Sequence, residues 1–317
     1  MGLFGKKRKE APPDDGIVVL KKTAPGTCGG TDAFQDTKVP KTIVSTEMIL
    51  FDAESALTPP LSPSREFDAG GKPCFFSAFA APAERGTFIF LSTSQGFRSR
   101  DRRSDAWALT DDPVFPALVA IVNEFDLAKR NGYHSMTHGL PENFGGYVDI
   151  RYGSGERIGL SDNQSPVVSF EAGQAIVSAF SRALGGKRVP LPDASDLREI
   201  RFLEDRGESG YTRAVLTVLP DGCGINKKVA KYSGPEVYES EKAVDAETVG
   251  AIKESINRSG ILAWSGLPEN GFRTGRNKKT VFVFEGGREI TVTDGKILPS
   301  RLSGGFFEIE LEMTTKH

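Results

Sequence analysis

The sequence predicts an α+β protein of two tandem homologous modules, each an antiparallel sheet of about five strands with one long helix packed on one face. Two repeated blocks carry this prediction. Residues 138–143 (HGLPEN) recur as residues 265–270 (SGLPEN), and residues 155–162 (GERIGLSD) recur as residues 287–294 (GREITVTD). Each block follows an amphipathic helical pattern, and a chain of 317 residues has the length of two domains. We therefore expect a duplicated unit.

Composition divides the chain into a tail and the two modules. Residues 1–42 are rich in Lys, Pro, Gly and Asp and show no apolar periodicity, so we expect a flexible N-terminal tail. The first module is expected at residues 43–186 and the second at residues 196–317. The segment at residues 185–195 contains two prolines and is the predicted linker.

The first module is expected to begin with strands. Residues 46–52 form the first of them. Residues 74–81 and 87–92 form a hairpin, because both arms are rich in aromatic residues and the break between them contains Pro and Gly. Residues 113–131 then form the clearest helix, with Asp112 as its N-terminal cap and Asn131-Gly132 at its exit.

A second hairpin and a helix capped at Ser169 close the first module. Along the first strand of this hairpin an apolar set of side chains alternates with a polar set: Val148, Ile150 and Tyr152 against Tyr147, Asp149 and Arg151. Such alternation means that one face of the sheet is buried and the other is wet or covers a partner.

The second module repeats this order. A strand at residues 198–204 and a hairpin at residues 212–219 and 224–231 precede a helix that Asp245 caps and Gly260 ends. The predicted cores contain Leu118, Ile121, Phe125 and Ile150 in the first module, and Ile252, Ile256, Phe282 and Ile290 in the second. Ile150 is expected to be equivalent to Phe282, and Ile158 to Ile290.

The end of the second module leaves one alternative open. Residues 306–313 alternate apolar residues with Glu, which favours a strand, whereas symmetry with the first module favours a helix. Trp264, in the loop that leaves the helix, is expected to sit at the mouth of the core of its module.

Charge and cysteine content narrow the classes of function. Forty basic against forty-two acidic residues leave a net charge of -2, so nucleic acid is not an expected partner. Cys28, Cys74 and Cys223 lack metal-ligand spacing and leave one cysteine over in any disulfide scheme. No stretch is long and apolar enough to span a bilayer or to form the core of a signal peptide. We expect a soluble protein of the cytoplasm.

Few side chains suit catalysis. His134 and His138 have the i, i+4 spacing of helical metal ligands, but Gly132 has already ended the predicted helix, so we expect loop histidines. Glu142 recurs as Glu269, and turn chemistry explains that recurrence. No serine–histidine or cysteine–histidine set and no phosphate-binding loop is evident. We therefore predict no metal, no cofactor and no catalytic residue.

The densest basic cluster precedes Trp107 in a predicted loop and consists of Arg98, Arg100, Arg102 and Arg103. A solvated loop explains this cluster. The alternative is that these arginines and Trp107 form the rim of a groove between the modules that binds a protein or an anionic ligand.

A second basic run lies in the tail, beside Leu3 and Phe4, and consists of Lys6, Lys7, Arg8 and Lys9. It would give weak association with an anionic membrane surface, which Asp14 and Asp15 oppose.

The repeated blocks resemble an uncharacterised family of bacterial proteins with a duplicated GLPEN and hairpin module. The segments that carry the resemblance are 131–133 (NGY) leading to 139–141 (GLP), 162–164 (DNQ), 264–268 (WSGLP) and 309–317 (IELEMTTKH). The resemblance covers both modules but not the tail. It implies a bacterial origin and no particular activity, so no site residue is carried over.

We therefore expect a non-catalytic intracellular binding or scaffold protein, because duplication doubles a binding surface. The alternative is a hydrolase-type enzyme with a site in the first module near His138 and Glu142. That alternative rests on His134 and His138, which have no histidine counterparts in the second module.

Overall fold

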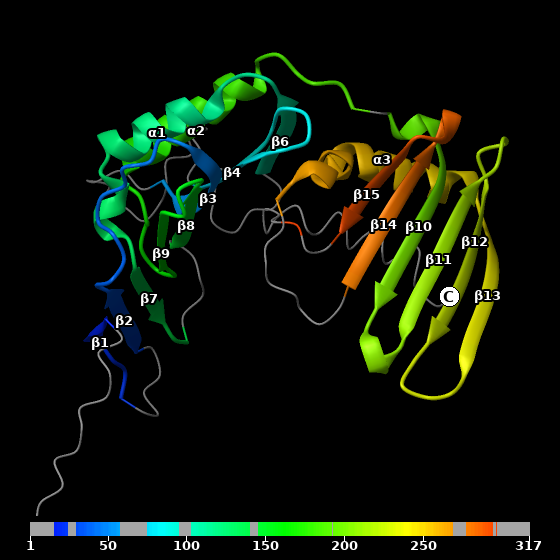
Figure 1. The fold of residues 1–317 in the computed structure, drawn as a ribbon, viewed down its shortest axis with the longest axis horizontal. Helices are drawn as coiled ribbons and strands as arrows, with labels where there is room; N and C mark the ends of the chain where they lie inside the picture. The colour runs from blue at the N-terminus through cyan, green and yellow to red at the C-terminus, as the bar shows by residue number, and fades with distance from the viewer. Residues whose placement is uncertain are drawn as a thin grey trace, which may run out of the picture.

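The computed structural model describes residues 16–24, 30–57, 75–94, 103–139, 145–191, 193–268, 277–293 and 296. Over these residues the protein has an α+β fold with two β-sheets (Figure 1). Helices α1 (Val114–Glu124) and α2 (Phe170–Leu184) pack on the first sheet, and α3 (Ala246–Ser259) accompanies the second.

The first sheet has nine strands. They are β1 (Ile17–Lys21), β2 (Thr31–Asp36), β3 (Met48–Ala56), β4 (Phe75–Pro82), β5 (Thr87–Ser94), β6 (Arg103–Thr110), β7 (Tyr133–Thr137), β8 (Gly146–Tyr152) and β9 (Arg157–Asp162). Their order is β1-β2-β7-β9-β8-β3-β4-β5-β6, and only the pair β7 and β9 is parallel. The predicted hairpin around residues 82–86 is confirmed as β4 and β5.

The second sheet has six strands, all antiparallel. They are β10 (Leu197–Asp205), β11 (Tyr211–Val218), β12 (Gly224–Lys231), β13 (Val237–Val244), β14 (Asn277–Phe284) and β15 (Glu289–Thr293). Their order is β13-β12-β11-β10-β14-β15. The predicted strand at residues 198–204 and the hairpin that follows it are confirmed as β10, β11 and β12, whereas β13 was not expected.

The two halves of the chain share one strand order. Each half has four strands, then a helix and then a hairpin, although β7 lies between α1 and the hairpin in the first half. These strands assemble as β9-β8-β3-β4-β5-β6 and as β15-β14-β10-β11-β12-β13. The register gives two matching rows of paired residues: Phe51, Ile150 and Ile158 in the first half, and Ile200, Phe282 and Ile290 in the second. The two hairpins therefore pair with β3 and β10 in matching registers, and each six-strand arrangement has one strand more than the five expected.

One core lies under α1 and α2, on one face of the first sheet. Leu118 and Ile121 of α1 and Ile150 of β8 are buried in it, as predicted, and Phe125 packs against it partly buried. On α2 the side chain of Ser169 accepts from the amide of Ala172 at 3.1 Å, which confirms the predicted cap.

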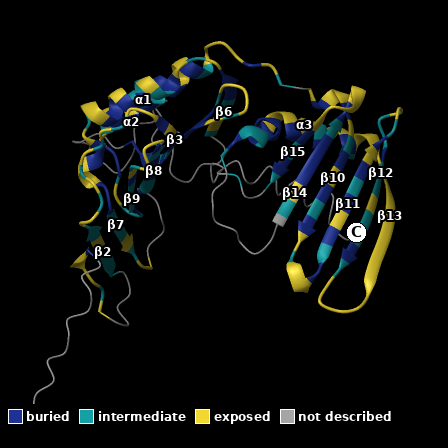
Figure 2. Cartoon of the chain, in the orientation of Figure 1, coloured by how far each residue is buried: buried dark blue, intermediate teal, exposed yellow. Residues whose placement is uncertain are grey.

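A second core is shared by the two halves. Phe79, Phe88 and Phe90 on the other face of the first sheet pack in one cluster with residues of the second sheet, of α3 and of the 3-10 helix η5 (Ile261–Gly266). The four residues predicted for the second core all belong to this cluster: Ile252, Ile256, Phe282 and Ile290. Figure 2 shows the buried residues along β10 and β14. The alternative given for the arginine cluster placed a groove between the modules; the described residues at this boundary instead pack apolar side chains in one core.

Two glycines allow the close approach of the halves. Gly260 ends α3 with a φ of 67°, as predicted, and a Cβ atom there would lie 2.6 Å from the ring of Trp107. A Cβ atom on Gly266, in the repeated GLPEN block, would lie 2.1 Å from the backbone nitrogen of Glu84 in the β4–β5 turn. Larger residues at these positions would push the halves apart.

The expected tail is ordered in its described part. β1 pairs with β2, and β2 pairs with β7, so residues of the predicted tail extend the first sheet. Short-range composition did not indicate this, because the pairing partner lies about a hundred residues further along the chain. Residues 1–15, which contain the basic run at 6–9, lie outside the described residues, as does the segment 306–313.

The ends of α1 also differ from expectation. Asp112 does not cap α1; its Oδ2 atom accepts from the backbone amide of Lys187 in the linker at 2.9 Å. The helix ends at Glu124, and Asp126 with a φ of 49° leads into the 3-10 helix η2 (Leu127–Arg130). The predicted single helix over 113–131 is therefore two shorter elements, because Asp126 takes a left-handed conformation that an α-helix excludes.

Candidate binding site on the first sheet

On the face of the first sheet that points away from α1 and α2, polar side chains occupy the part formed by β7, β9, β8 and β3, beside the apolar cluster on β4 and β5. Cross-strand pairing sets Asp52 beside Asp149, and it sets Glu54, Tyr147, Ser161 and His134 in the neighbouring row. Residues between them in the same strands, such as Ala53 and Val148, are buried under the helices. We call these side chains, together with Arg151 and Arg157, the polar face.

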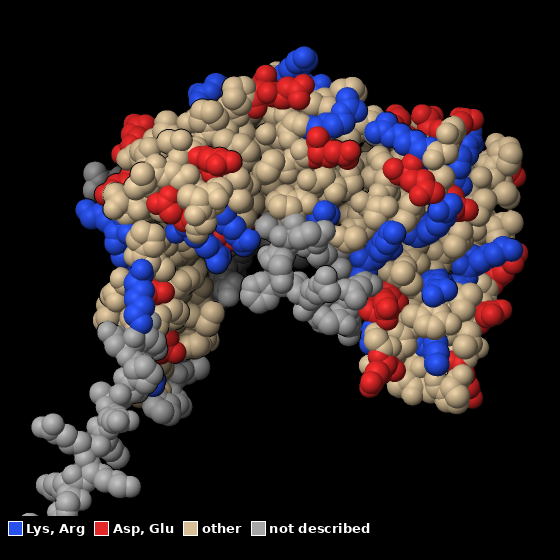
Figure 3. Space-filling view, viewed as in Figure 1, with Lys and Arg blue, Asp and Glu red and all other residues tan. Residues whose placement is uncertain are grey.

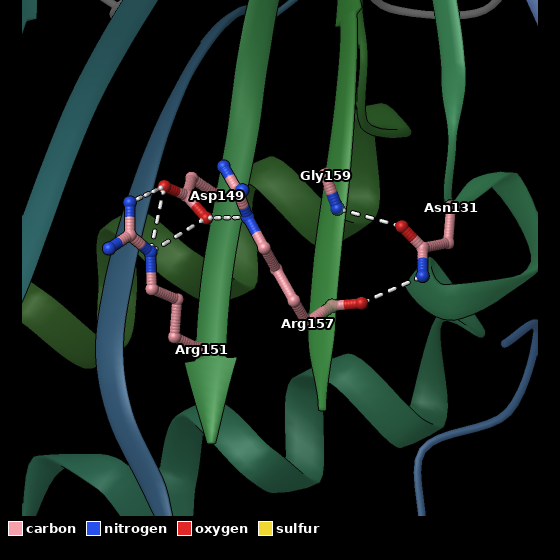
Figure 4. A network of polar contacts seen from close by, with 5 residues as sticks. All are labelled: Asn131, Asp149, Arg151, Arg157 and Gly159. Atoms are coloured by element: carbon pink, nitrogen blue, oxygen red, sulfur yellow. Dashed lines mark hydrogen bonds and ion pairs between the residues drawn. The ribbon is translucent and has the colours of Figure 1, made fainter. Parts of the chain in front are cut away.

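Asp149 holds two arginines on the polar face (Figure 4). Its Oδ2 atom accepts from Nη2 of Arg151 at 2.8 Å, and its Oδ1 atom accepts from Nε of Arg157 at 2.7 Å. The side chain of Asp149 is 18% exposed and that of Arg157 is 59% exposed. Both guanidinium groups are therefore directed to one carboxylate, while Arg157 also meets solvent.

Asp52 is the second carboxyl of this arrangement. The hydroxyl of Tyr147 donates to its Oδ1 atom at 3.0 Å, and in the part of the chain that the structure describes no other group hydrogen-bonds to it. The pKa of Asp52 is raised from 3.8 to about 7, chiefly by burial and further by the negative charges of Asp149 and Glu54. The hydrogen bond from Tyr147 and the charge of Arg151 act in the opposite direction. Near neutral pH, Asp52 can therefore bind or release a proton.

His134 extends the polar face towards β2. Its Nδ1 atom lies 2.9 Å from Oγ of Ser161, and its ring centroid lies 5.1 Å from that of Phe34. Burial, and then the charge of Arg157, lower the pKa of His134. A neutral imidazole at physiological pH adds no positive charge to the polar face.

Asn131 fixes the strand that carries Arg157 and Ser161. Its side-chain amide donates to the backbone oxygens of Arg157 at 2.7 Å and Pro40 at 2.8 Å, and its Oδ1 atom accepts from the amide of Gly159 at 2.8 Å (Figure 4). The residue is 2% exposed. Asn131 thus hydrogen-bonds the backbone of β9 as a neighbouring strand would. The sequence had indicated Asn131 only as the end of a helix.

The predicted arginine rim is only partly described. Arg98, Arg100 and Arg102 lie outside the described residues. Arg103 lies in β6, where its Nε atom contacts Asp105 at 2.7 Å. Trp107 also lies in β6 rather than in a loop, and its ring nitrogen donates to the backbone oxygen of Arg258 in α3 at 2.8 Å. Trp107 is therefore part of the contact between the halves.

The predicted cluster of His138 and Glu142 is likewise only half described, because Glu142 lies outside the described residues. Nε2 of His138 lies 3.0 Å from Oδ2 of Asp32, with side chains 48% and 44% exposed. His138 has an acidic neighbour, but the ring is half open to solvent and lies at the end of β7, apart from Asp52.

Sequence reasoning identified the polar alternation in β8 but missed Asp52 and Arg157 as its partners. The available signal was the charge on alternate positions of three predicted strands. Their assembly depends on which strands pair, and pairing is not encoded in any one segment.

Comparison with protein-family models and with curated proteins found no match for this chain. Among the described helices, none has the length and apolar content needed to cross a membrane.

Proposed function

We propose that this chain is a non-catalytic binding protein and that the polar face of the first sheet is its ligand-binding surface. The observation that carries the proposal is Asp52. It is a half-buried carboxyl, oriented by Tyr147, that takes part in no ion pair among the described residues. Burying a charge without a partner costs stability, so such a group is typical of a site that a ligand completes.

The equivalent face of the second sheet supports this reading by contrast. The shared register places Arg201 at the position of Asp52, and Arg201 is ion-paired with Glu199 and, at 2.9 Å, with Glu289. Basic and acidic side chains lie interspersed over the second sheet in Figure 3. Arg201 is thus paired with carboxylates of the same sheet, as expected of a solvated face.

We further propose that the two halves arose by duplication and that the first then specialised. The shared strand order and the matching register support a common origin. The difference between Asp52 and Arg201 supports specialisation, because Arg201 is ion-paired whereas Asp52 makes no ion pair among the described residues.

The alternative, a hydrolase-type site near His138 and Glu142, is less well supported. A general base works best when it is held in a site that limits access of water, and the ring of His138 is half exposed.

The test is retention of compounds from a cell extract on the immobilised full-length protein, read by mass spectrometry. We compare the wild type with Tyr147→Phe and Arg157→Gln, which alter the polar face, and with Glu289→Gln, a matched change on the second sheet. The wild type and Glu289→Gln should retain compounds that the other two lose, and these should be recovered unchanged. Equal retention by all four proteins would reject the polar face, and recovery of converted products would indicate an enzyme.

A further inference from the structure

We infer that the edge strand β1 of the first sheet pairs with β1 of a second copy of this chain, antiparallel and about a two-fold axis at Val18. The inference does not depend on the polar face as a binding site. It rests on the exposure of β1, on the lack of charge along it, and on the opposite charges at its two ends.

β1 is an exposed apolar edge. In the part of the chain that the structure describes it ends the first sheet, with β2 as its one strand neighbour. Figure 1 shows this edge on the side of the first sheet that is remote from the second sheet. All residues of β1 are exposed, Val19 to 61% and Leu20 to 55%, and residues 17–20 (IVVL) are large and apolar. An edge of this kind is a template for pairing with another chain.

The other sheet edges among the described strands carry charge. β13 has Glu239 and Glu241 along its length, β6 begins with Arg103 and Asp105, and β15 begins with Glu289. Charged side chains on an edge strand oppose the approach of a second strand. Positions 16–20 hold no charged residue, so β1 lacks this protection.

Charges at the two ends of β1 make the strand complementary to itself. Asp14 and Asp15 immediately precede it in the sequence, whereas Lys21 and Lys22 lie at its other end. Asp36 of β2 adds a carboxylate at the acidic end, where it pairs with the first residue of β1. Antiparallel pairing of two copies brings each acidic end to a basic end, twice by symmetry, whereas parallel pairing would bring like charges together. The charges therefore favour a second copy as the partner strand.

Two further charges lie near these ends and do not change the sign of either. The side chain of Lys38 lies against Gly16 at the acidic end. Beyond the basic end, Asp32 accepts from the backbone amide of Thr23 at 2.7 Å. Three carboxylates thus outweigh one lysine at the first end, and two lysines outweigh one carboxylate at the second.

The register that matches the charged ends has Val18 on the two-fold axis. Residues 17–19 pair regularly with β2, and the register shifts only between Val19 and Lys21. Ile17 of each copy would then lie opposite Val19 of the other, and residues 14–15 opposite residues 21–22. Ile17 and Val19 share a face with Phe34, which is 37% exposed, so pairing joins the apolar side chains of both copies in one strip.

The dimer would place two polar faces side by side. The two-fold axis of an antiparallel pair is perpendicular to the sheet, so both polar faces lie on the same side of one continuous sheet. Phe34 connects the apolar strip to the polar face, because its ring centroid lies 5.1 Å from that of His134. The contact is small, below the roughly 1,200 Å² of a standard interface, so we expect a dissociation constant on the order of tens of micromolar.

Sedimentation equilibrium of the full-length protein, from about 1 µM to about 500 µM, measures this association. One variant combines Asp14→Lys with Asp15→Lys, and a second combines Lys21→Glu with Lys22→Glu. Each variant has like charges at both ends of β1, so each alone should associate at least about tenfold more weakly than the wild type. An equimolar mixture of the two should dimerise as the wild type does, because opposite charges then meet at both ends. Recovery in the mixture also shows that both variants fold.

Two single-surface controls locate the interface. Val18→Lys places two ammonium groups together at the two-fold axis and should abolish the dimer. Glu239→Lys with Glu241→Lys, a matched double reversal on the edge strand β13, should leave it unchanged. The inference is overturned by a wild type that stays monomeric up to about 500 µM, well above the expected dissociation constant. It is equally overturned by a dimer that persists in Val18→Lys or in both charge-reversal variants, or by a mixture that stays monomeric.

Discussion

Asp52 makes the stability of the protein depend on pH. Its pKa is raised from 3.8 to about 7, so the folded protein keeps a proton that the unfolded chain has released. The stabilisation that comes from this difference is fully present below pH 3.8, the pKa in the unfolded chain, and is lost as the pH rises through about 7, the pKa in the folded protein. Asp52→Asn keeps the acceptor for Tyr147 and cannot ionise. We expect it to raise the free energy of unfolding by about 2–3 kcal/mol at about pH 8, less than the full shift because the carboxyl keeps some contact with water.

Urea unfolding at about pH 8 and about pH 4 measures this effect. The difference between Asp52→Asn and wild type should shrink towards the lower pH, where the aspartate is neutral in both states. A difference that stays constant with pH would show that ionisation is not its cause.

The size of the Trp264 side chain is important for the stability of the protein. Its side chain is fully buried, and among the described residues its indole N–H has no hydrogen-bond partner. Trp264→Ala should lower the free energy of unfolding by about 3–5 kcal/mol. Trp264→Phe should cost only about 1–2 kcal/mol, because it also removes the unsatisfied N–H. Chemical denaturation measures both, and a Phe variant as unstable as the Ala variant would contradict this account of the N–H group.

Sequence patterns at the residue scale indicated the charged face of β8 but not the importance of Asp52. The alternation of Tyr147, Asp149 and Arg151 with apolar residues is a property of one strand, and it is readable locally. The raised pKa of Asp52 arises from burial and from the charges of Asp149 on β8 and Glu54 on its own strand, and the burial and the contact with β8 exist only in the folded sheet.

At the scale of elements, Asn131 joins η2, the segment before β3 and β9. Its side chain makes three hydrogen bonds to backbone groups while it is almost fully buried. Asn131→Ala leaves those groups without partners, and we expect a loss of about 2–4 kcal/mol in the free energy of unfolding. Asn131→Asp, of nearly equal size, cannot donate to the two carbonyl oxygens and should be at least as damaging. Thermal unfolding checks both, and a well-tolerated Asp variant would show that the two donated bonds matter little.

Elements with local signals were predictable, and those without them were not. Asp245 and Ser169 cap their helices as expected, because a cap and the amide it satisfies lie within one turn. Asp112 accepts a hydrogen bond from Lys187 in the linker instead of capping α1, and these two residues are 75 positions apart in the sequence. Strand β13 is exposed along almost its whole length, so it has no alternation of buried and exposed residues to reveal it (Figure 2).

At the scale of the molecule, the repeated blocks predicted two similar units, and the sheets do share one strand order. The relation between the units was not predictable from those blocks. The face of β4 and β5 that packs against the second half bears Phe79, Phe88 and Phe90, which read in the sequence only as an aromatic-rich hairpin. Those side chains form one core with residues of α3 and η5, so the halves are not independent modules around a groove.

The shared core predicts that the two halves unfold together. Phe88 of β5 and Trp264 of η5 belong to one buried cluster, so loss of either side chain should destabilise the same cooperative unit. In calorimetry the full-length protein should show one transition whose calorimetric and van't Hoff enthalpies agree. Phe88→Ala and Trp264→Ala should each lower the midpoint of that single transition, with a loss of about 3–5 kcal/mol in the free energy of unfolding for Phe88→Ala.

As a control, Lys227→Ala removes an exposed ion pair of the second sheet and should leave the midpoint nearly unchanged. Two separate transitions, with Phe88→Ala moving one and Trp264→Ala the other, would show that each half is stable on its own despite the shared core.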